Sequence, residues 1–487
     1  MSGIAASVSS FVSDESDPPL FDNGEVLGRS EFISLSDEEI PLTSPTDPGD
    51  KVADFKNQKG LNDWQTGFLL FGATVGTGIF VLPPCFAKAG YAAFFLFIVL
   101  LCQSHYCGVL LGRCWVMTKE RNPFYRESHV RYPYAAIAYE AFGYWIKWLY
   151  IVIITVFTIS NMAAILLVVS DLFVTVMEQL FSNLETSFCS VPPIMAAIIM
   201  PFMLLGTPND FWLGGILGTL TTILATILVF CQTTIDVHRG AGSGPPSGRT
   251  MSTTALFSFI GTFFFAAESH NIYPTIQHDM ANQKRFSPTL AASNIAVGLT
   301  FIVITIPTYI VYGDAMTSLQ VESLMQVLPD GLIRLLCSMA MMPHFIVAIV
   351  VFANPLNQQM EELLDIPIGF CWQRCVIRGS LLFGVVFIAE TVPHFGVLIP
   401  FVGGTLLSLM SLLGPPVFYL RLYPKQAFKY TWESRSVPRR ERFICYFLIG
   451  ITPLFIFTII YTGIAAIVRD ESVFTVPCYV NASQAHI

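Results

Sequence analysis

Eleven apolar stretches follow one another along the chain, separated by shorter polar segments. Each is close to the roughly 17 to 25 residues that a helix needs to cross about 30 Å of hydrocarbon. The stretches cover residues 66–87, 91–112, 148–179, 192–209, 211–233, 252–273, 290–313, 331–354, 379–392, 395–420 and 443–468. This pattern predicts an all-α polytopic membrane protein with about eleven transmembrane helices and a transmembrane transporter domain over residues 60–468.

The composition and the distribution of basic residues support this topology. Of the 487 residues 53% are hydrophobic and only 12% are charged, which is too apolar for an ordinary soluble protein. Of the 26 Lys and Arg residues, 21 lie in the N-terminal segment and in the loops 113–147, 274–289, 355–378 and 421–442. Since Lys and Arg accumulate on the cytoplasmic side, the N-terminus is predicted to be cytoplasmic and the C-terminus lumenal or extracellular.

The two chain ends are predicted to lie outside the membrane. Residues 1–59 are expected to form a disordered acidic cytoplasmic tail, since the first 50 residues carry eleven acidic side chains and one basic one, Arg29. The tail could bind a sorting or signalling partner, or it could serve only to solubilise. Residues 469–487 form a short lumenal or extracellular tail with a glycosylation sequon at Asn481. Cys189 and Cys478 fall on that side too, where they could form a disulfide or stay free.

The first apolar stretch contains residues that interrupt helices. It reads FGATVGTGIFVLPPCFAKAG over residues 71–90. In hydrocarbon, irregular backbone survives only where protein or a polar cavity surrounds it. An unwound segment around residues 74–78 would offer free amides and carbonyls to a ligand. The alternative is close helix packing through Gly72 and Gly76, a GxxxG pair.

A second interrupted stretch, SFIGTFFFAAESHNIYP over residues 258–274, places polar residues before a terminating Pro274. If the eleven spans divide as five, five and one, the two interrupted spans open corresponding halves. Paired broken helices at matching positions are typical of inverted-repeat transporters with a site near the bilayer midplane.

Four segments in order resemble the amino acid/auxin permease family. They are VGTGIFVLPPCFAKAGY at 75–91, GTFFFAAESHNIYPTIQHDMANQKRFSP at 261–288, YIVYGDAMTSLQVESLMQVLP at 309–329 and IPFVGGTLLSLMSLLGPPVFYLRLYP at 399–424. The nearest branches are the proton-coupled amino acid transporters and the vesicular inhibitory amino acid transporter. The resemblance implies a fold of the leucine-transporter type, with a five-plus-five inverted repeat and one extra helix.

The same resemblance implies which residues bind substrate. They are Thr74, Val75, Gly76, Thr77 and Gly78 in the first span, facing Phe265, Glu268, Ser269 and His270 in the sixth. Two positions depart from the family. Apolar residues near Leu69 and Leu70 replace a histidine of proton-coupled members, and Ser269 replaces a glycine, which narrows the space.

Buried polar residues give the candidate coupling groups. Glu268 is the best candidate for a proton carrier, because a carboxyl group at low dielectric can load and release a proton near neutral pH; the alternative is a hydrogen-bonded helix clamp. His270 titrates near neutrality and could share that proton or touch substrate. Asn161 could line the site or join two helices.

Other function classes find little support. After Ser338 the eighth span offers no Ser or Thr through Pro355, which weighs against a sodium site and favours protons. Enzyme, metal-site and nucleic-acid-binding motifs are missing, so no cofactor and no nucleic acid partner are expected.

These features together predict a secondary transporter of amino acids or related small amines, coupled to protons, whose partners are its substrate, protons and membrane lipid. The alternative is an amino-acid-binding sensor with little net flux. The plasma membrane, lysosome or endosome, and vesicles remain open, with a vacuolar or lysosomal membrane favoured.

Overall fold

The computed structural model describes the chain in thirteen segments. These are residues 60–76, 78–122, 124–127, 130, 132–181, 187–204, 212–246, 253–318, 321–367, 371–392, 395–423, 436–469 and 477–480. The predicted acidic tail over residues 1–59, Thr77 and the sequon at Asn481 lie outside the described residues.

The described residues are helical with short connections. The helices are α1 (Asp63–Val75), α2 (Gly78–Ala89), α3 (Ala92–Arg121), α4 (Phe124–Glu127), α5 (Pro133–Phe142), α6 (Tyr144–Leu180), η1 (Phe188–Ser190), α7 (Val191–Met203), α8 (Trp212–Arg239), α9 (Thr253–Ala267), α10 (Tyr273–Asp279), η3 (Gln283–Arg285), α11 (Phe286–Met316), η4 (Leu324–Gln326), α12 (Leu332–Leu363), α13 (Trp372–Thr391), α14 (Phe395–Val402), η5 (Gly403–Leu407), η6 (Leu409–Leu413), α15 (Gly414–Leu422) and α16 (Arg439–Arg469).

Each predicted apolar stretch coincides with one of these helices or with a broken pair of them. In the described part of the chain, seven helices are long and apolar enough to cross a membrane, or eight if the bent pair α1 and α2 counts as one span. Helices α7 and α9 are apolar but shorter. Helix α13 extends the predicted ninth stretch toward the N-terminus, to Trp372. The result is an all-helical chain built to span a membrane several times.

The tenth stretch is less regular than its pattern predicts. Between α14 and α15 the backbone makes two π-helical turns, η5 and η6. Glycine permits close approach here, because a Cβ atom added to Gly403 would overlap the backbone of Gly261 and lie 2.6 Å from the Cβ atom of Phe265. The irregular turns therefore lie directly against α9, beside its broken end.

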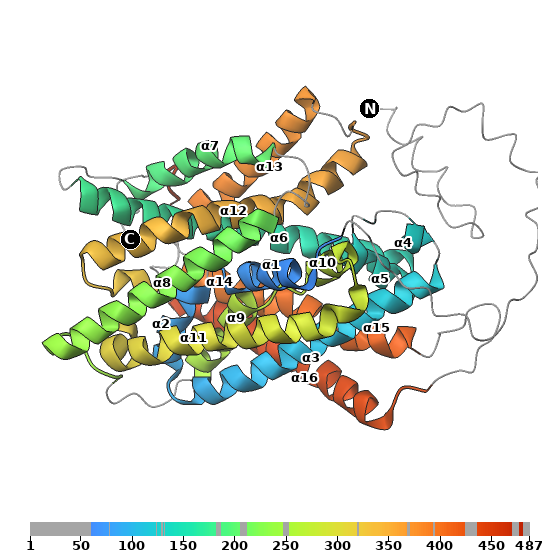
Figure 1. Cartoon of the computed structure of the whole chain (residues 1–487), viewed down its shortest axis with the longest axis horizontal. Helices are drawn as coiled ribbons and strands as arrows, with labels where there is room; N and C mark the ends of the chain where they lie inside the picture. Colours follow the sequence, from blue (N-terminus) through green and yellow to red (C-terminus); the bar gives the residue numbers. More distant parts are fainter. Residues whose placement is uncertain are drawn as a thin grey trace, which may run out of the picture. The chain divides into compact units, whose positions relative to one another are not determined.

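The two broken spans lie in the middle of the bundle. Helix α1 packs against α8 and α11, and α2 packs against α9 and α11. Helix α12 packs against both α6 and α8. The long helices α3, α6, α8, α11 and α12 run in roughly the same direction, with α1, α2 and α9 among them (Figure 1). Irregular backbone in α1–α2 and α9–α10 is thus surrounded by protein.

One end of α1 is tied to the end of α10. The Leu61 amide donates to the Asp279 carbonyl and the Ala281 amide donates to the Leu61 carbonyl, each at 2.8 Å. An ion pair between Arg285 and Asp63 at 2.8 Å lies next to this bridge. The first turn of α1 is closed by a capping box between Asn62 and Gln65. These contacts hold the two broken spans together at this end.

A disulfide joins two distant segments at the opposite end of the helices. Cys189 in η1 is bonded to Cys478, with Cα atoms 5.3 Å apart and 289 residues between them in sequence. The Cys478 amide donates to the Glu390 carbonyl at the end of α13. The segment at residues 477–480 is therefore anchored to α7 and α13.

Candidate functional site

The first span breaks at Gly76. Helix α1 ends at Val75, α2 begins at Gly78, and the two axes differ by 48°. Gly76 has φ 28° and ψ −130°, a conformation that glycine adopts far more readily than other residues. Because the last carbonyls of a helix lack partners within it, the break exposes hydrogen-bonding backbone groups inside the bundle.

The neighbouring glycines have a different role, which is close packing. A Cβ atom on Gly72 would lie 3.1 Å from the Gly215 carbonyl oxygen of α8. A Cβ atom on Gly78 would lie 2.6 Å from the Ala266 carbonyl oxygen of α9. Both interpretations of the glycine pattern therefore apply, but to different residues: Gly76 forms the break, and the glycines on either side let α1 and α2 approach their neighbours.

The sixth span breaks between α9 and α10, over residues 268–272. Pro274, which the sequence pattern placed at the end of this span, lies instead in the first turn of α10, where no amide donor is required. The Ser269 hydroxyl donates to the Ala73 carbonyl at 3.0 Å. The two breaks are therefore joined directly.

Glu268 and His270 approach each other within the second break. Both side chains are fully buried, and the His270 Nδ1 atom lies 3.5 Å from the Glu268 Oε2 atom. The Ser104 and Ser411 hydroxyls lie close enough to interact with the Glu268 carboxyl group, although neither of its oxygens has a hydrogen bond of regular geometry among the described residues. The other ring nitrogen of His270 lies 3.2 Å from the Ser104 carbonyl of α3, and the ring packs on Tyr273 at 4.7 Å between centroids.

A small cavity lies between the two breaks, α6 and α12. It is lined by Gly72, Ala73, Thr74, Gly76, Phe157, Asn161, Ile165, Phe265, Ala266, Glu268, Phe345, Ala348 and Phe352. We call it the central cavity. Its volume of about 20 Å³ is enough for one or two waters at about 10–15 Å³ each. In this conformation the cavity is closed around less space than an amino acid occupies.

The central cavity contains some of the predicted site residues and not others. Thr74, Gly76, Asn161, Phe265 and Glu268 line it. Val75, Gly78, Ser269 and His270 are buried beside the breaks but are not among its lining residues. Thr77 lies outside the described residues.

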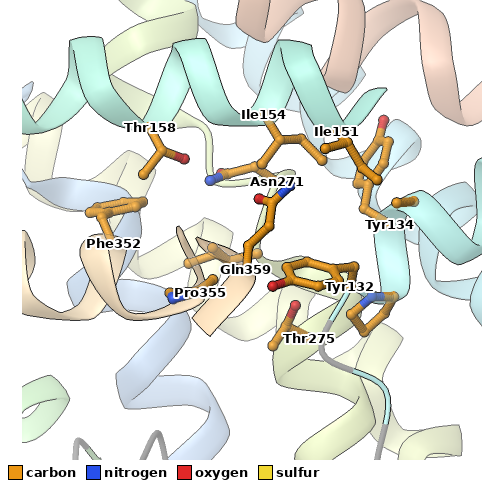
Figure 2. Close-up of a pocket in the computed structure, with 13 residues that line it drawn as sticks. Tyr132, Tyr134, Ile151, Ile154, Thr158, Asn271, Thr275, Phe352, Pro355 and Gln359 are labelled. Atoms are coloured by element: carbon orange, nitrogen blue, oxygen red, sulfur yellow. The ribbon is translucent and has the colours of Figure 1, made fainter. Parts of the chain in front are cut away.

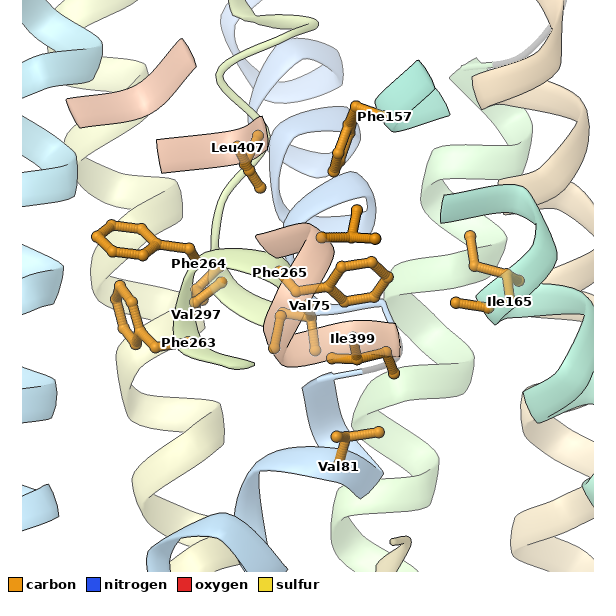
Figure 3. Packing of buried hydrophobic residues seen from close by; sticks show 14 of the residues in the cluster. Val75, Val81, Phe157, Ile165, Phe263, Phe264, Phe265, Val297, Ile399 and Leu407 are labelled. Atoms are coloured by element: carbon orange, nitrogen blue, oxygen red, sulfur yellow. The ribbon is translucent and has the colours of Figure 1, made fainter. Parts of the chain in front are cut away.

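The apolar walls of the cavity come from α6 and α12, the third and eighth spans, which the family resemblance implied as contributors of side chains; their individual apolar residues were not predicted. Phe157 and Ile165 flank Asn161 at spacings of four residues, and Phe345, Ala348 and Phe352 follow at three and four. Such spacings place residues on one helix face, so a sequence signal existed. Figure 3 shows the Phe265 ring beside Val75 and Ile399, pointing toward the part of α6 that carries Ile165.

Asn161 is the polar group of the α6 wall. Its side chain is only 5% exposed, and its Nδ2 atom has no hydrogen-bond partner among the described residues. An amide that joined two helices would be hydrogen-bonded, because an unpaired buried donor costs about 1–3 kcal/mol. The cavity therefore presents an unpaired amide donor on α6 and the Glu268 carboxyl group at the second break.

Comparisons with known proteins cover most of the chain. A family model described as transmembrane amino acid transporter protein matches residues 59–462. The amino acid transporter AVT1J of Arabidopsis thaliana is 22% identical over 448 residues, covering 88% of this chain and 96% of the relative. The amino acid transporter AVT1B of the same plant is 22% identical over 418 residues, covering 80% and 72% respectively.

A solved structure supports the all-helical membrane fold described above. The chain resembles the crystal structure of a manganese transporter mutant from Eremococcus coleocola, with a TM-score of 0.54 and 14% sequence identity. The match covers 86% of this chain and 92% of the other. At this identity the likeness concerns the fold alone.

Proposed function

The chain belongs to the transmembrane amino acid transporter protein family, and on that premise we propose that it is a secondary active transporter that moves an amino acid or related small amine together with a proton. Its family is one of membrane transporters and not of enzymes. Substrate would reach the central cavity from either side in turn, by alternating access around the breaks in α1–α2 and α9–α10.

The proposed architecture follows from the paired breaks. In it, α1–α2, α3, α6, α7 and α8 form one half, α9–α10, α11, α12, α13 and α14–α15 form the inverted second half, and α16 is the extra helix. Each half then begins with its broken span, as expected for the leucine-transporter type. The N-terminus is cytoplasmic, and the disulfide and Asn481 are lumenal or extracellular.

The groups around the central cavity suit a zwitterion. The C-terminal ends of α1 and α9 meet there and attract an ammonium group. Glu268 offers an acceptor oxygen to the ammonium group, and Asn161 offers a donor to the carboxylate. The surrounding rings of Phe157, Phe265 and Phe345 favour an uncharged substrate side chain.

Glu268 carries the proposal of proton coupling. It is buried and lines the cavity, with the Ser104 and Ser411 hydroxyls and His270 as polar neighbours. A buried charge inside the membrane costs several kcal/mol, so the substrate-loaded transporter would rearrange readily only when a proton neutralises this carboxylate, which moves the proton in the same direction as the substrate. His270 at 3.5 Å could exchange that proton with it.

The deciding experiment is uptake of the twenty common amino acids into proteoliposomes. It would be run with an imposed pH gradient, with an imposed sodium gradient and with neither. We expect uptake driven by the pH gradient, and a loss of that dependence in Glu268→Gln, which keeps the shape of the side chain. Uptake driven by sodium would contradict proton coupling. Saturable binding without flux would identify a sensor instead.

A further inference from the structure

A second cavity lies next to the central one, between α5, α6, α10 and α12. It is lined by Tyr132, Pro133, Tyr134, Ala135, Ile151, Ile154, Thr158, Asn271, Ile272, Thr275, Phe352, Pro355 and Gln359. We call it the vestibule. Its volume of about 40 Å³ would hold about three waters. Figure 2 shows its labelled side chains, with Thr158 and Gln359 reaching into the space from α6 and α12.

The vestibule and the central cavity share one wall. Phe352 lines both of them, and on α6 the adjacent residues Phe157 and Thr158 line the central cavity and the vestibule respectively. The segment between α9 and α10 also runs from one cavity to the other, because Glu268 lines the first and Asn271 lines the second. Phe352 is thus a wall residue of both cavities, which share three lining elements.

One polar atom of the vestibule has no hydrogen-bond partner among the described residues, and another group is only partly hydrogen-bonded. Asn271 is 8% exposed, and its Oδ1 atom has no hydrogen-bond partner among the described residues. Gln359 accepts a hydrogen bond at Oε1 from the Thr155 hydroxyl at 3.4 Å, which orients its amide and directs its two Nε2–H donors elsewhere. Buried polar groups in proteins are normally satisfied, so an open acceptor beside a cavity indicates a ligand or water.

The vestibule offers partners for both ends of a zwitterion. The Asn271 oxygen can accept from an ammonium group, which the rings of Tyr132, Tyr134 and Phe352 can also contact through their faces. The Thr158 and Thr275 hydroxyls and the Gln359 amide can donate to a carboxylate. None of the described residues that line it is charged, so a molecule of no net charge fits better than an anion or a cation.

We propose that the vestibule is a second binding site for the zwitterionic amino acid, which occupies it in passing between the central cavity and the face of the membrane where α6 begins, and that the Phe352 ring separates the two sites. This proposal rests on the proposed transport function. In it, substrate that leaves Glu268 meets Asn271 next, so that a hydrogen-bonding partner for its ammonium group is present at both steps.

The test uses the full chain and the amino acid that the wild-type protein takes up fastest in the uptake panel. In a Gln359→Cys variant, the new thiol is labelled with a small maleimide and labelling of its peptide is followed by mass spectrometry. The same protein without this substitution reports labelling of the native cysteines. We expect the amino acid to slow labelling at position 359 several-fold.

Two additional substitutions separate the sites. Ala348→Phe fills the central cavity, and in Gln359→Cys with Ala348→Phe we expect protection at position 359 to persist. Asn271→Leu removes the open acceptor, and in Gln359→Cys with Asn271→Leu we expect protection to be lost. Thr275→Val, a change that keeps the side-chain shape, should weaken protection as well and guards against an Asn271 variant that fails to fold.

The opposite result would overturn the proposal. If Ala348→Phe abolishes protection while Asn271→Leu and Thr275→Val leave it unchanged, position 359 reports only the occupancy of the central cavity. Failure of the proposed function looks different, because the wild-type protein would then show no gradient-driven uptake in the panel. Phe352→Ala adds an independent readout: removal of the ring should accelerate exchange of labelled for unlabelled amino acid across the membrane, whereas no change would show that the ring does not separate the sites.

Discussion

The Ser269 hydroxyl donates a hydrogen bond to the Ala73 carbonyl oxygen, across 196 residues of sequence and at 3.0 Å. Ala73 lies in the last turn of α1, where carbonyl groups lose their intrahelical partners because of the break at Gly76. Ser269 stands where many relatives carry glycine. Its hydroxyl, in the break between α9 and α10, therefore supplies a hydrogen-bond donor to a carbonyl group at the break between α1 and α2. The sequence pattern predicts that Ser269 narrows the substrate space, but in the structure the hydroxyl faces the backbone of α1.

Removing this hydroxyl should loosen the contact between the two breaks. In Ser269→Ala we expect a loss of about 1 kcal/mol, since one hydrogen bond disappears and a carbonyl is left unsatisfied. The measurement is the melting temperature of the purified protein together with uptake in proteoliposomes. Ser170→Ala is the matched control, because the Ser170 hydroxyl bonds to the Leu166 carbonyl within α6 and joins no two elements. Equal effects on uptake in the two variants would contradict the linking role.

The glycines of the first span should respond differently to alanine. A Cβ atom on Gly76 meets nothing within 4 Å, so Gly76→Ala would cost only the strain of its positive φ, about 1–3 kcal/mol. Gly78→Ala would place a methyl group 2.6 Å from the Ala266 carbonyl oxygen and must displace α9. We expect Gly76→Ala to fold with reduced uptake and Gly78→Ala to yield little folded protein. Size-exclusion chromatography in detergent distinguishes the two results, and similar yields would show that α2 and α9 can move apart.

Asn161 gives a prediction in which stability and binding change independently. If its unpaired amide serves the substrate, Asn161→Leu should weaken amino acid binding roughly ten- to a hundredfold, because a hydrogen bond to a charged carboxylate contributes about 1.5–3 kcal/mol. The melting temperature of the empty protein should not fall, since no bond among the described residues is lost. A lower melting temperature with unchanged binding would instead support a role in joining helices.

The disulfide can be tested by chemistry and by topology. We expect Cys189 and Cys478 to resist maleimide until a reductant is added, and tryptic fragments containing them to separate only after reduction. In sealed vesicles with the lumenal face outside, a membrane-impermeant reductant should release both thiols. Cys85→Ser is the control, because Cys85 is a free cysteine of α2. Release only from the opposite face would contradict the proposed orientation.

The fold was largely predictable because membrane crossing imposes a length and a polarity that are visible in sequence. All eleven apolar stretches coincide with helical segments, the tenth with four short ones, and a break near Gly76 was one of two interpretations of the glycines. The π-helical turns η5 and η6 were not expected, because they depend on the close approach of Gly261 and Gly403 in the folded bundle. Packing between segments that lie far apart in the chain leaves no periodic pattern in the sequence.

The candidate site was predictable only where a residue departs from the apolar pattern of a membrane span. Residues in the irregular segments, such as Glu268, stand out as polar groups in apolar surroundings. The apolar walls do not, because Phe157 and Phe345 resemble any other residue of a membrane helix until tertiary contacts assign one face to the cavity. The vestibule was missed altogether, since Asn271 and Gln359 come to line one cavity only in the folded bundle.

A buried ion cluster at the ends of α7, α12 and α13 gives the last prediction. The Arg378 side chain is 1% exposed, donates to Glu361 at 2.7 Å and also bonds to the Met203 carbonyl at 2.5 Å. Arg374 donates to the same Glu361 oxygen at 3.0 Å. Removing one member of a buried pair costs about 3–5 kcal/mol when the remaining charge is uncompensated. Because Arg374 still pairs with Glu361, Arg378→Leu should cost less than this, and the melting temperature should fall through loss of one ion pair and of the bond to Met203.

The matched control is the exposed ion pair between Arg334 and Asp330, in which the Asp330 side chain is 81% exposed. Exposed pairs contribute about 0–1 kcal/mol, so Arg334→Leu should change the melting temperature little. Combining Arg378→Leu with Glu361→Leu should lower the melting temperature further, because Arg374 then loses its buried partner. If the double variant is instead more stable than Arg378→Leu alone, Arg374 does not compensate the charge on Glu361, and that charge is the main cost of Arg378→Leu.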